Sequence, residues 1–517
     1  MQPELPLPAA PADLAATLSL PNPAAFYAGI RTLGGARVSA LPNSPELALA
    51  AGLGLPVQAA SALVLDRPAA GALLAAESGA TAVVVAFQVR NGRELVLSLS
   101  GGATPARRTT VDTKSGLTTL TAPDGSAFGV LGDWLVLAST PDALDTAGPY
   151  VTRVLGARSA AASGLRVDFV SAAFPRLASV ITARWQALRA SLAELADKAR
   201  AEAGRPADFA DPQLILGFAE DVVHRTGARI ASSRAATFTL ELGADRAELA
   251  FELEPAPGSS AASELASSVT GPLDPLLALP RDTVLGLVSR QPPPPNAAEA
   301  APPEGPVESV LDAKLGGIDK TTLRDTVALL ARGVGETTVV GLLPDETVVL
   351  EGDLRDAGAL EQAERSVVAG LNAPELRAEL TPFFGKRVVR TRTERVPGFD
   401  APIHHVVLPL AKPGEREPEL AWGVHGQALF ATLGRAEGAS FAALASAPST
   451  STLGADLELR AAAARRNPAS FAAMANLSGL AGAPAYVLFA YGKRGKAARL
   501  ELELDGAAPS FLGRLVP

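Results

Sequence analysis

The chain has 517 residues, of which 48% are hydrophobic and 19% charged, and its mean hydropathy is +0.20. This length exceeds what one hydrophobic core serves, and the composition excludes an intrinsically disordered chain. A formal charge of −8 offers no electrostatic footprint for nucleic acid, and the absence of cysteine excludes disulfides, thiolate metal sites and cysteine nucleophiles.

The N-terminal segment, residues 1–11, is rich in proline and lacks the basic and apolar regions of a signal peptide. We interpret it as a tether that follows a processed N-terminus, with a lipid anchor before residue 2. Together with the missing cysteine, this favours export to the periplasm or outer surface of a bacterium, with a cytoplasmic protein as the alternative. The longest apolar stretch, 471–491, is interrupted by Pro484, so we expect no membrane span.

The sequence of the first half predicts antiparallel strands together with helices. Asn or Ser before Pro is typical of a helix start and Gly of a helix end, and Asn91-Gly92 predicts a hairpin turn. The expected elements are a strand at 17–20, helices at 23–34 and 45–52, strands at 62–66, 82–90, 94–100 and 127–138, and a helix from Pro141.

The second half repeats this opening order. Its expected elements are a strand at 283–288, helical segments at 307–315 and 318–332, and strands at 337–342 and 346–353. Residues 255–280, which begin Pro-Ala-Pro-Gly-Ser-Ser, separate the two halves as a linker.

A nine-residue string supports a duplication. Residues 127–135, AFGVLGDWL, return as residues 421–429, AWGVHGQAL. Three flanking matches follow in the same order: Leu33-Gly34-Gly35 with Leu315-Gly316-Gly317, 164–169 with 454–459, and the hairpin 236–254 with 485–504. We therefore predict an α+β fold of two tandem copies, 12–254 and 281–517, each an antiparallel sheet with helices packed on one face.

Two insertions break the symmetry. The second half carries a Pro-rich loop at 291–306, which we interpret as a spacer. The first half carries a helical insertion at 174–229, whose helix 174–203 has an apolar stripe. The stripe either packs on its own sheet or contacts a ligand or partner. For the second case the candidate contact residues are Trp185, Leu188 and Leu192.

Catalytic and metal-binding patterns are sparse. Glu220, Asp221 and His224 share a helical face, but no second such motif completes a dimetal site. Strand alternation sends His404 and His405 to opposite faces. His425 replaces Leu131 of the other copy, which indicates a packing position. No nucleophile-elbow, zincin, P-loop or dinucleotide motif occurs, so we predict no enzyme activity, no metal and no cofactor.

Arg390 and Arg392 lie on one face of a predicted strand. They either bind an anionic glycan or lipid headgroup, or protect a sheet edge against aggregation, which is the ordinary use of charge on an edge strand.

The order of elements resembles a family of bacterial envelope proteins that is defined only as a domain of unknown function. The residues that carry this resemblance are Leu20-Pro21-Asn22-Pro23, then Gly129-Val130, Gly132 and Leu135, then Thr140-Pro141 with Ala143-Leu144. The resemblance implies an exported or lipid-anchored protein and brings no catalytic residues.

These observations lead to three hypotheses. The first is a non-catalytic binding or scaffold protein of the bacterial cell envelope, whose partner is an envelope component. The second is a carrier of a lipid or other apolar ligand, which requires a sizeable apolar cavity. The third is a hydrolase with unrecognised acidic residues, which requires a buried acid pair in a cleft.

Overall fold

The structure is a computed structural model of the whole chain, and part of the chain is described. The described residues are 7–34, 38, 41–52, 60–75, 81–100, 108–112, 116–121, 127–158, 164–203, 220, 223–224, 226–243, 245–291, 320–374, 376–377, 381, 387–396, 399, 401–409, 417–434 and 452–509. The predicted loop 291–306, its residue Gln291 apart, and the predicted helical segment 307–315 lie outside them.

Both halves contain strands and helices in a mixed order. The first half contains β1 (Leu14–Leu20), α1 (Pro23–Gly34), α2 (Pro45–Gly52), β2 (Ala69–Ala75), β3 (Thr81–Gln88), α4 (Gly92–Ser100), β4 (Arg108–Val111), β5 (Thr118–Thr121), β6 (Ala127–Leu131), β7 (Trp134–Ala138), α5 (Pro141–Tyr150), η2 (Val151–Leu155), β8 (Leu165–Phe169), η3 (Ser171–Ala173), α6 (Phe174–Ala203), β9 (Ser233–Leu242) and β10 (Arg246–Pro255). After α8 (Ser260–Ser267) and α9 (Asp274–Leu277), the second half contains β11 (Leu285–Arg290), α11 (Lys320–Gly333), β12 (Val334–Leu342), β13 (Val348–Leu354), α12 (Ala357–Leu371), β14 (Arg390–Glu394), β15 (Ile403–Val407), β16 (Glu419–His425), β17 (Ala428–Gly434), η5 (Leu453–Ala455), α15 (Leu457–Arg465), β18 (Phe471–Asn476), α16 (Ser478–Ala481), β19 (Ala485–Arg494) and β20 (Ala497–Gly506).

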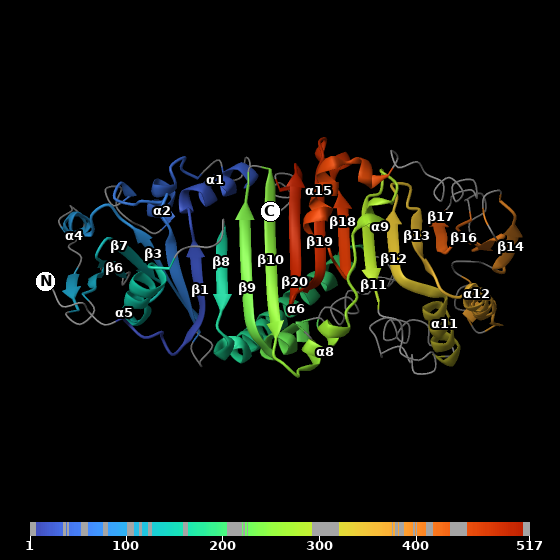
Figure 1. Cartoon of the computed structure of the whole chain (residues 1–517), viewed down its shortest axis with the longest axis horizontal. Coiled ribbons are helices and arrows are strands. Elements are labelled where there is room, and N and C mark those ends of the chain that lie inside the picture. Colours follow the sequence, from blue (N-terminus) through green and yellow to red (C-terminus); the bar gives the residue numbers. More distant parts are fainter. Residues whose placement is uncertain are drawn as a thin grey trace.

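All the strands of the described residues join one antiparallel sheet of 20 strands. Along the sheet, the first half runs β4-β5-β6-β7-β3-β2-β1-β8-β9-β10. The second half continues from β10 as β20-β19-β18-β11-β12-β13-β17-β16-β15-β14. Figure 1 shows this continuous sheet, with the N-terminal strands at one end and β14 at the other. The α+β prediction is confirmed, but the prediction of separate sheets is wrong.

The seam between the halves is the pairing of β10 with β20. At its centre Ala250 pairs with Glu501. Each of these residues lies four positions beyond the residue that closes its hairpin turn, Arg246 in β10 and Ala497 in β20. β10 and β20 are the last strands of their own halves, and they pair antiparallel about this point at equivalent positions.

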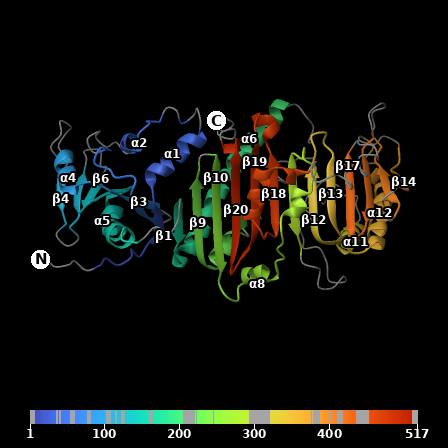
Figure 2. The same cartoon turned by 45° about the horizontal axis from the view of Figure 1, so that its top comes forward.

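Helices cover both faces of the sheet, which corrects the prediction of one covered face. In β7, Val136 packs in the core cluster of α5, whereas its neighbour Leu135 packs in the cluster that holds Leu95 and Leu99 of α4. Successive residues of a strand point to opposite faces, so α5 and α4 lie on opposite sides of the sheet. Figure 2, turned from the view of Figure 1, shows helices on both sides.

The repeated nine-residue string forms equivalent hairpins. Gly129 pairs with Val136 and Gly423 pairs with Phe430, in β6–β7 and β16–β17 respectively. Both turns begin with a glycine in the left-handed region, Gly132 at φ 57° and Gly426 at φ 62°. A glycine is preferred there because a Cβ atom would cost energy in that conformation.

Several local predictions fail. Residues 94–100 are a helix, because Asn91 caps α4 by accepting hydrogen bonds from the amides of Arg93 and Glu94, and because Leu95 and Leu99 are buried one turn apart. Residues 62–66 form only an isolated bridge, and the strand that follows, β2, lies in the alanine-rich segment 69–75, which has weak strand propensity.

Two of the flanking matches are also wrong or untested. Residues 454–459 lie across η5 and the start of α15, whereas the strand that occupies the place of β8 in the second half is β18. The match at 315–317 lies outside the described residues, and the described helix between β11 and β12 is α11. The hairpin match is confirmed as β9–β10 and β19–β20.

Candidate functional site

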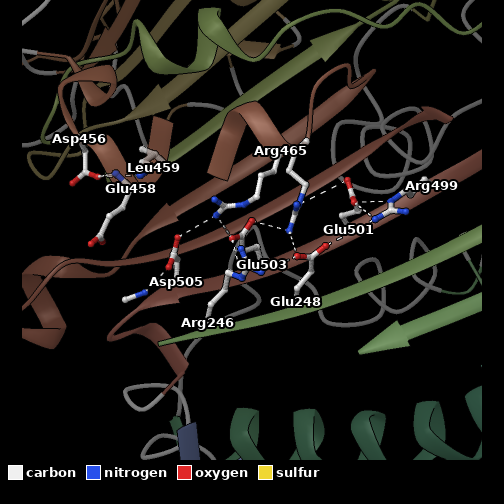
Figure 3. A network of polar contacts seen from close by, with 12 residues as sticks. Arg246, Glu248, Asp456, Glu458, Leu459, Arg465, Arg499, Glu501, Glu503 and Asp505 are labelled. Atoms are coloured by element: carbon white, nitrogen blue, oxygen red, sulfur yellow. Dashed lines mark hydrogen bonds and ion pairs between the residues drawn. The ribbon is translucent and has the colours of Figure 1, made fainter. Parts of the chain in front are cut away.

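Charged side chains gather on one face of the seam. Alternate residues of β10 and β20 point to this face, and Arg465 at the end of α15 reaches it (Figure 3). The next residue, Arg466, also pairs with the carboxylates of this face. We call this set the seam network, and its members are Arg246, Glu248, Glu252, Arg465, Arg466, Arg499, Glu501, Glu503 and Asp505.

Arg466 is the centre of the seam network. Its side chain is 2% exposed and lies 2.7 Å from the Glu503 carboxylate and 3.3 Å from that of Glu248. Glu503 is fully buried and also pairs with Arg465. Since Glu248 belongs to β10 while Arg466 follows α15, these ion pairs link the two halves.

Arg499 forms a second link across the seam. Its guanidinium lies 2.5 Å from Glu501 and pairs with Glu252 of β10. Hydrogen bonds and ion pairs with the two glutamates raise the pKa of Arg499 against the opposing effect of its burial. Each buried carboxylate of the network therefore has an arginine partner, which suits a structural role better than acid–base catalysis.

Acidic residues elsewhere in the described part of the chain do not form the buried pair that a hydrolase needs. Burial, with the neighbouring Asp353, raises the pKa of Glu351, but the cavity beside Glu351 has a volume of only about 30 Å3. A groove of about 810 Å3 beside α2 is lined by Glu46, which is half-buried, and by the exposed Asp66 and Asp133. Among the described residues, then, no acid pair is both buried and open to a substrate-sized cleft.

A cavity of about 380 Å3 lies between α8 and the strands near the seam. Its apolar wall comes from α8, the end of β10 and the neighbouring strands. The main apolar lining residues are Leu253, Leu265, Phe471, Tyr491 and Ala498.

Polar groups lie at two places on the cavity lining. Arg229 and Glu264 form an exposed ion pair at 2.7 Å, while Arg290 and Ser470 are each 8% exposed. The Arg290 guanidinium donates to the carbonyl oxygens of Ala469, at 3.0 Å, and Pro272. Burial lowers the pKa of Arg290, against the opposing attraction of the Asp353, Glu336 and Asp274 carboxylates.

The predicted contact residues of the long insertion lie on α6. Leu188 is 51% exposed, and Trp185, one turn before it, is half-buried with its indole nitrogen lacking a hydrogen-bond partner. The side chain of Leu192 lies outside the described set. At the start of α6, Phe174 is buried with Phe251 of β10 packed near it. Phe251 and Glu252 are successive residues, so α6 lies on the opposite face of the sheet from the seam network.

Arg390 and Arg392 lie on β14, which pairs only with β15 in the described part of the sheet. Both are exposed, and both are neutralised by neighbours: Arg390 by Glu417 at 2.6 Å, and Arg392 by Glu419 at 3.1 Å. This arrangement favours the edge-protection interpretation over an anion site.

The histidines are separated as the sequence predicts. His404 stacks on Trp422 and contacts Glu364 of α12, whereas His405, on the opposite face, is buried against Glu419. His425 is exposed and contacts Phe399, unlike the buried Leu131 of the first half, so its packing role differs from our expectation.

The remaining histidine is His224, which lies 3.8 Å from Glu220, while Asp221 lies outside the described residues. In the part of the chain that the structure describes, no three or more His, Asp or Glu residues are grouped to hold a metal ion.

Sequence reasoning missed Arg290 and Ser470. The only signal is an arginine two residues after the predicted strand 283–288, and nothing in the sequence indicates that Ser470, far along the chain, lies beside it. The helices that the structure describes include none with the length and hydropathy of a membrane span.

Comparison with known proteins adds little. No family model and no curated protein matches the chain. One solved structure, described as "Structure of crystal form I of TP0453", aligns with 50% of this chain and 82% of its own, at 6% identity and a TM-score of 0.25. A likeness this weak indicates neither fold nor function.

Proposed function

We propose that the chain is a non-catalytic binding or scaffold protein of the bacterial cell envelope, located in the periplasm or on the outer surface, and built from two copies of one α+β unit. The matching strand order of the halves supports the two-copy origin. The absence of cysteine, the Pro-rich segment 1–11 and the resemblance to an envelope family support the location.

One observation carries the binding role, namely that the long helix α6 has no counterpart between β18 and β19 of the second half. Residues 170–232 connect β8 to β9, whereas residues 477–484 suffice for the same connection in the second half. A helix that only completes the fold would be needed in both halves and would bury its apolar side chains. Leu188 is half-exposed and Trp185 is not fully buried, which suits contact with an envelope component.

Photo-crosslinking tests this role. A photoreactive residue replaces Leu188 in the full chain, expressed in the organism that encodes it, and a matched chain carries it at Leu480, which is 74% exposed on α16. We expect a discrete adduct from position 188 in the envelope fraction, weakened by Trp185→Ala, and none from position 480. Equal adducts from both positions, or recovery of the chain in the cytosol, contradict the proposal.

A second candidate function is the transport or storage of an apolar ligand. The cavity beside α8 supports it, because its volume of about 380 Å3 falls in the range of small-molecule sites and its walls are largely apolar. Binding of an apolar fluorescent probe that is displaced on filling the cavity tests this function. An unchanged probe signal in an Ala498→Phe variant contradicts it.

A further inference from the structure

A polar pocket of about 270 Å3 lies between β8 and the end of η2, and we call it the β8 pocket. Asp168 of β8 pairs with Thr237 of β9, which pairs with Glu252 of the seam network. Residues that pair across neighbouring strands point to the same face, so the β8 pocket lies on the face of the seam network and away from α6. Its floor and one wall include Thr17, Ser19, Trp134, Arg166 and Asp168.

In the second half, apolar residues stand at the places equivalent to this floor. The repeated string aligns Trp134 with Ala428, and strand pairing carries the alignment across the sheet. Equivalent rows of paired residues run from β7 to β8 as Val136, Ala86, Ala70, Ser19 and Arg166, and from β17 to β18 as Phe430, Glu351, Val339, Val288 and Ala472. The floor residues Thr17, Ser19, Arg166 and Asp168 therefore correspond to Gly286, Val288, Ala472 and Met474.

The helices that cover these places differ between the halves. In the second half, Leu459 of α15 packs in one core cluster with Ala472 and Met474 of β18. In the first half, α5 and η2 precede β8 as α15 precedes β18, but they pack over β2 and β3, and their core cluster includes no described residue of β8. The side chains of Arg166 and Asp168 stay 39% and 45% exposed, and an ion pair so exposed contributes little to stability. Binding accounts for this pair better than stability does.

Arg166 and Asp168 hold each other in place. Nε and one terminal nitrogen of Arg166 donate to the Asp168 carboxylate at 2.8 to 3.0 Å, and the Thr237 hydroxyl donates to the same carboxylate at 2.9 Å. Further N–H donors of the guanidinium and lone pairs of the carboxylate remain for a ligand. The hydroxyls of Thr17 and Ser19 also make no hydrogen bond to a described residue. The pocket thus offers both donors and acceptors.

Trp134 connects the β8 pocket to a larger space. Its half-buried side chain lines both this pocket and the groove of about 810 Å3 beside α2. Together the two linings carry four arginines and four carboxylates, so their charges balance. An indole supplies a flat apolar surface, and the balanced charges supply hydrogen bonds without attracting an ion of either sign. This combination matches a ligand that is neutral and rich in hydroxyl groups.

We propose that the β8 pocket and the groove beside α2 bind a neutral oligosaccharide, with one sugar ring in the pocket and the following rings in the groove. A sugar ring has an apolar face of C–H groups, which packs on Trp134, and a rim of hydroxyls, which bond to Arg166 and Asp168. At about 30 Å3 per water molecule, the pocket has room for about nine waters, enough for one sugar ring. This site is separate from α6 and from the cavity beside α8, so the inference goes beyond the proposed function and does not rest on it.

Calorimetric titration of the full chain with four hexasaccharides tests the proposal. Cellohexaose and chitohexaose are neutral, the glucosamine hexamer is cationic and the galacturonate hexamer is anionic. We expect at least one neutral hexamer to bind with 1:1 stoichiometry and about tenfold more tightly than either charged hexamer. The physical reason is that a charged sugar loses hydration and finds no excess of opposite charge in the balanced lining.

Two variants and a control locate the site. Trp134→Ala introduces the residue that the second half has at this place, and it should weaken the neutral hexamer about tenfold. Arg166→Ala should weaken it several-fold and leave the urea unfolding of the chain nearly unchanged, because the side chain is partly exposed. Arg390→Ala removes an exposed arginine that is paired with a carboxylate on β14, and it should leave binding unchanged.

Each outcome decides one part of the proposal. Binding of neither neutral hexamer, or equal affinity for a charged one, overturns the ligand class. Neutral binding that survives both Trp134→Ala and Arg166→Ala overturns the site. The proposed function is tested apart from these results, because α6 lies on the opposite face of the sheet and the adduct from position 188 should form equally in Trp134→Ala.

Discussion

The seam network predicts a large and specific cost for Arg466→Met. Methionine keeps much of the arginine stem, so the change removes mainly the charge. Arg466 is 2% exposed and lies within 4.0 Å of three glutamates, Glu248, Glu501 and Glu503. Removing one partner of a buried ion pair costs about 3–5 kcal/mol. Because Glu503 keeps its contact with Arg465, we expect a loss near the lower limit, about 3 kcal/mol in the free energy of unfolding.

Urea unfolding measures this loss, and two further variants control it. Arg390→Met removes an arginine that is 63% exposed and paired at the surface, so it should cost at most about 1 kcal/mol. The double variant Arg466→Met/Glu503→Leu removes both buried charges and should recover part of the loss. If Arg466→Met costs no more than Arg390→Met, or if the double variant costs as much as Arg466→Met alone, the network does not stabilise the seam as reasoned.

Three further predictions concern turns and titrating groups. Gly132→Ala and Gly426→Ala should each cost about 1 kcal/mol in the free energy of unfolding by urea, since φ is positive at both and no atom would meet the new Cβ. Gly129→Ala should cost more, because two leucine side chains lie 2.8 and 2.9 Å from the position of its Cβ. Burial and a hydrogen bond to Asp456 raise the pKa of Tyr486 to about 12, above its ordinary value of 10.0. The protonated phenol should therefore contribute fully to the free energy of unfolding below pH 10.0, and this contribution should fall as the pH rises to about 12. The pH dependence should be missing in Tyr486→Phe. Burial raises the pKa of Glu351 above 4.5, so the wild-type chain should lose stability relative to Glu351→Gln as the pH rises from 4.5 to 7; a constant difference across that range would contradict the shift.

Local patterns in the sequence predict the hairpins well. Residues 246–255 and 497–506 alternate apolar and polar side chains, and both form strands of such hairpins. The same alternation shows that each strand has one apolar face. It does not show which strand pairs with the outer side of each hairpin. For this reason the joining of the halves through β10 and β20 could not be predicted, and two sheets were expected where there is one.

The failures at 94–100 and at the cavity have different causes. At 94–100, Asn-Gly is a strong turn signal, yet Asn91 also caps a helix, and the burial of Leu95 and Leu99 against the sheet decides between the two. At the cavity, Arg290 and Ser470 meet only through the pairing of β11 with β18. Contacts between residues so far apart in the chain leave no pattern within either segment.

The cavity beside α8 and the helix α6 meet at one side chain. Leu253 of β10 lines the cavity beside α8 and also packs with Phe174 and Leu177 at the start of α6. The strand framework and the glycine turns recur in both halves, so they account for the fold and not for a difference between the halves. An apolar ligand in the cavity would touch the side chain that supports α6, and the exposed contact residue Leu188 lies farther along that same helix. The cavity proposed for an apolar ligand and the proposed contact surface are therefore physically connected, which makes α6 the element on which an effect of binding in this cavity should first be sought.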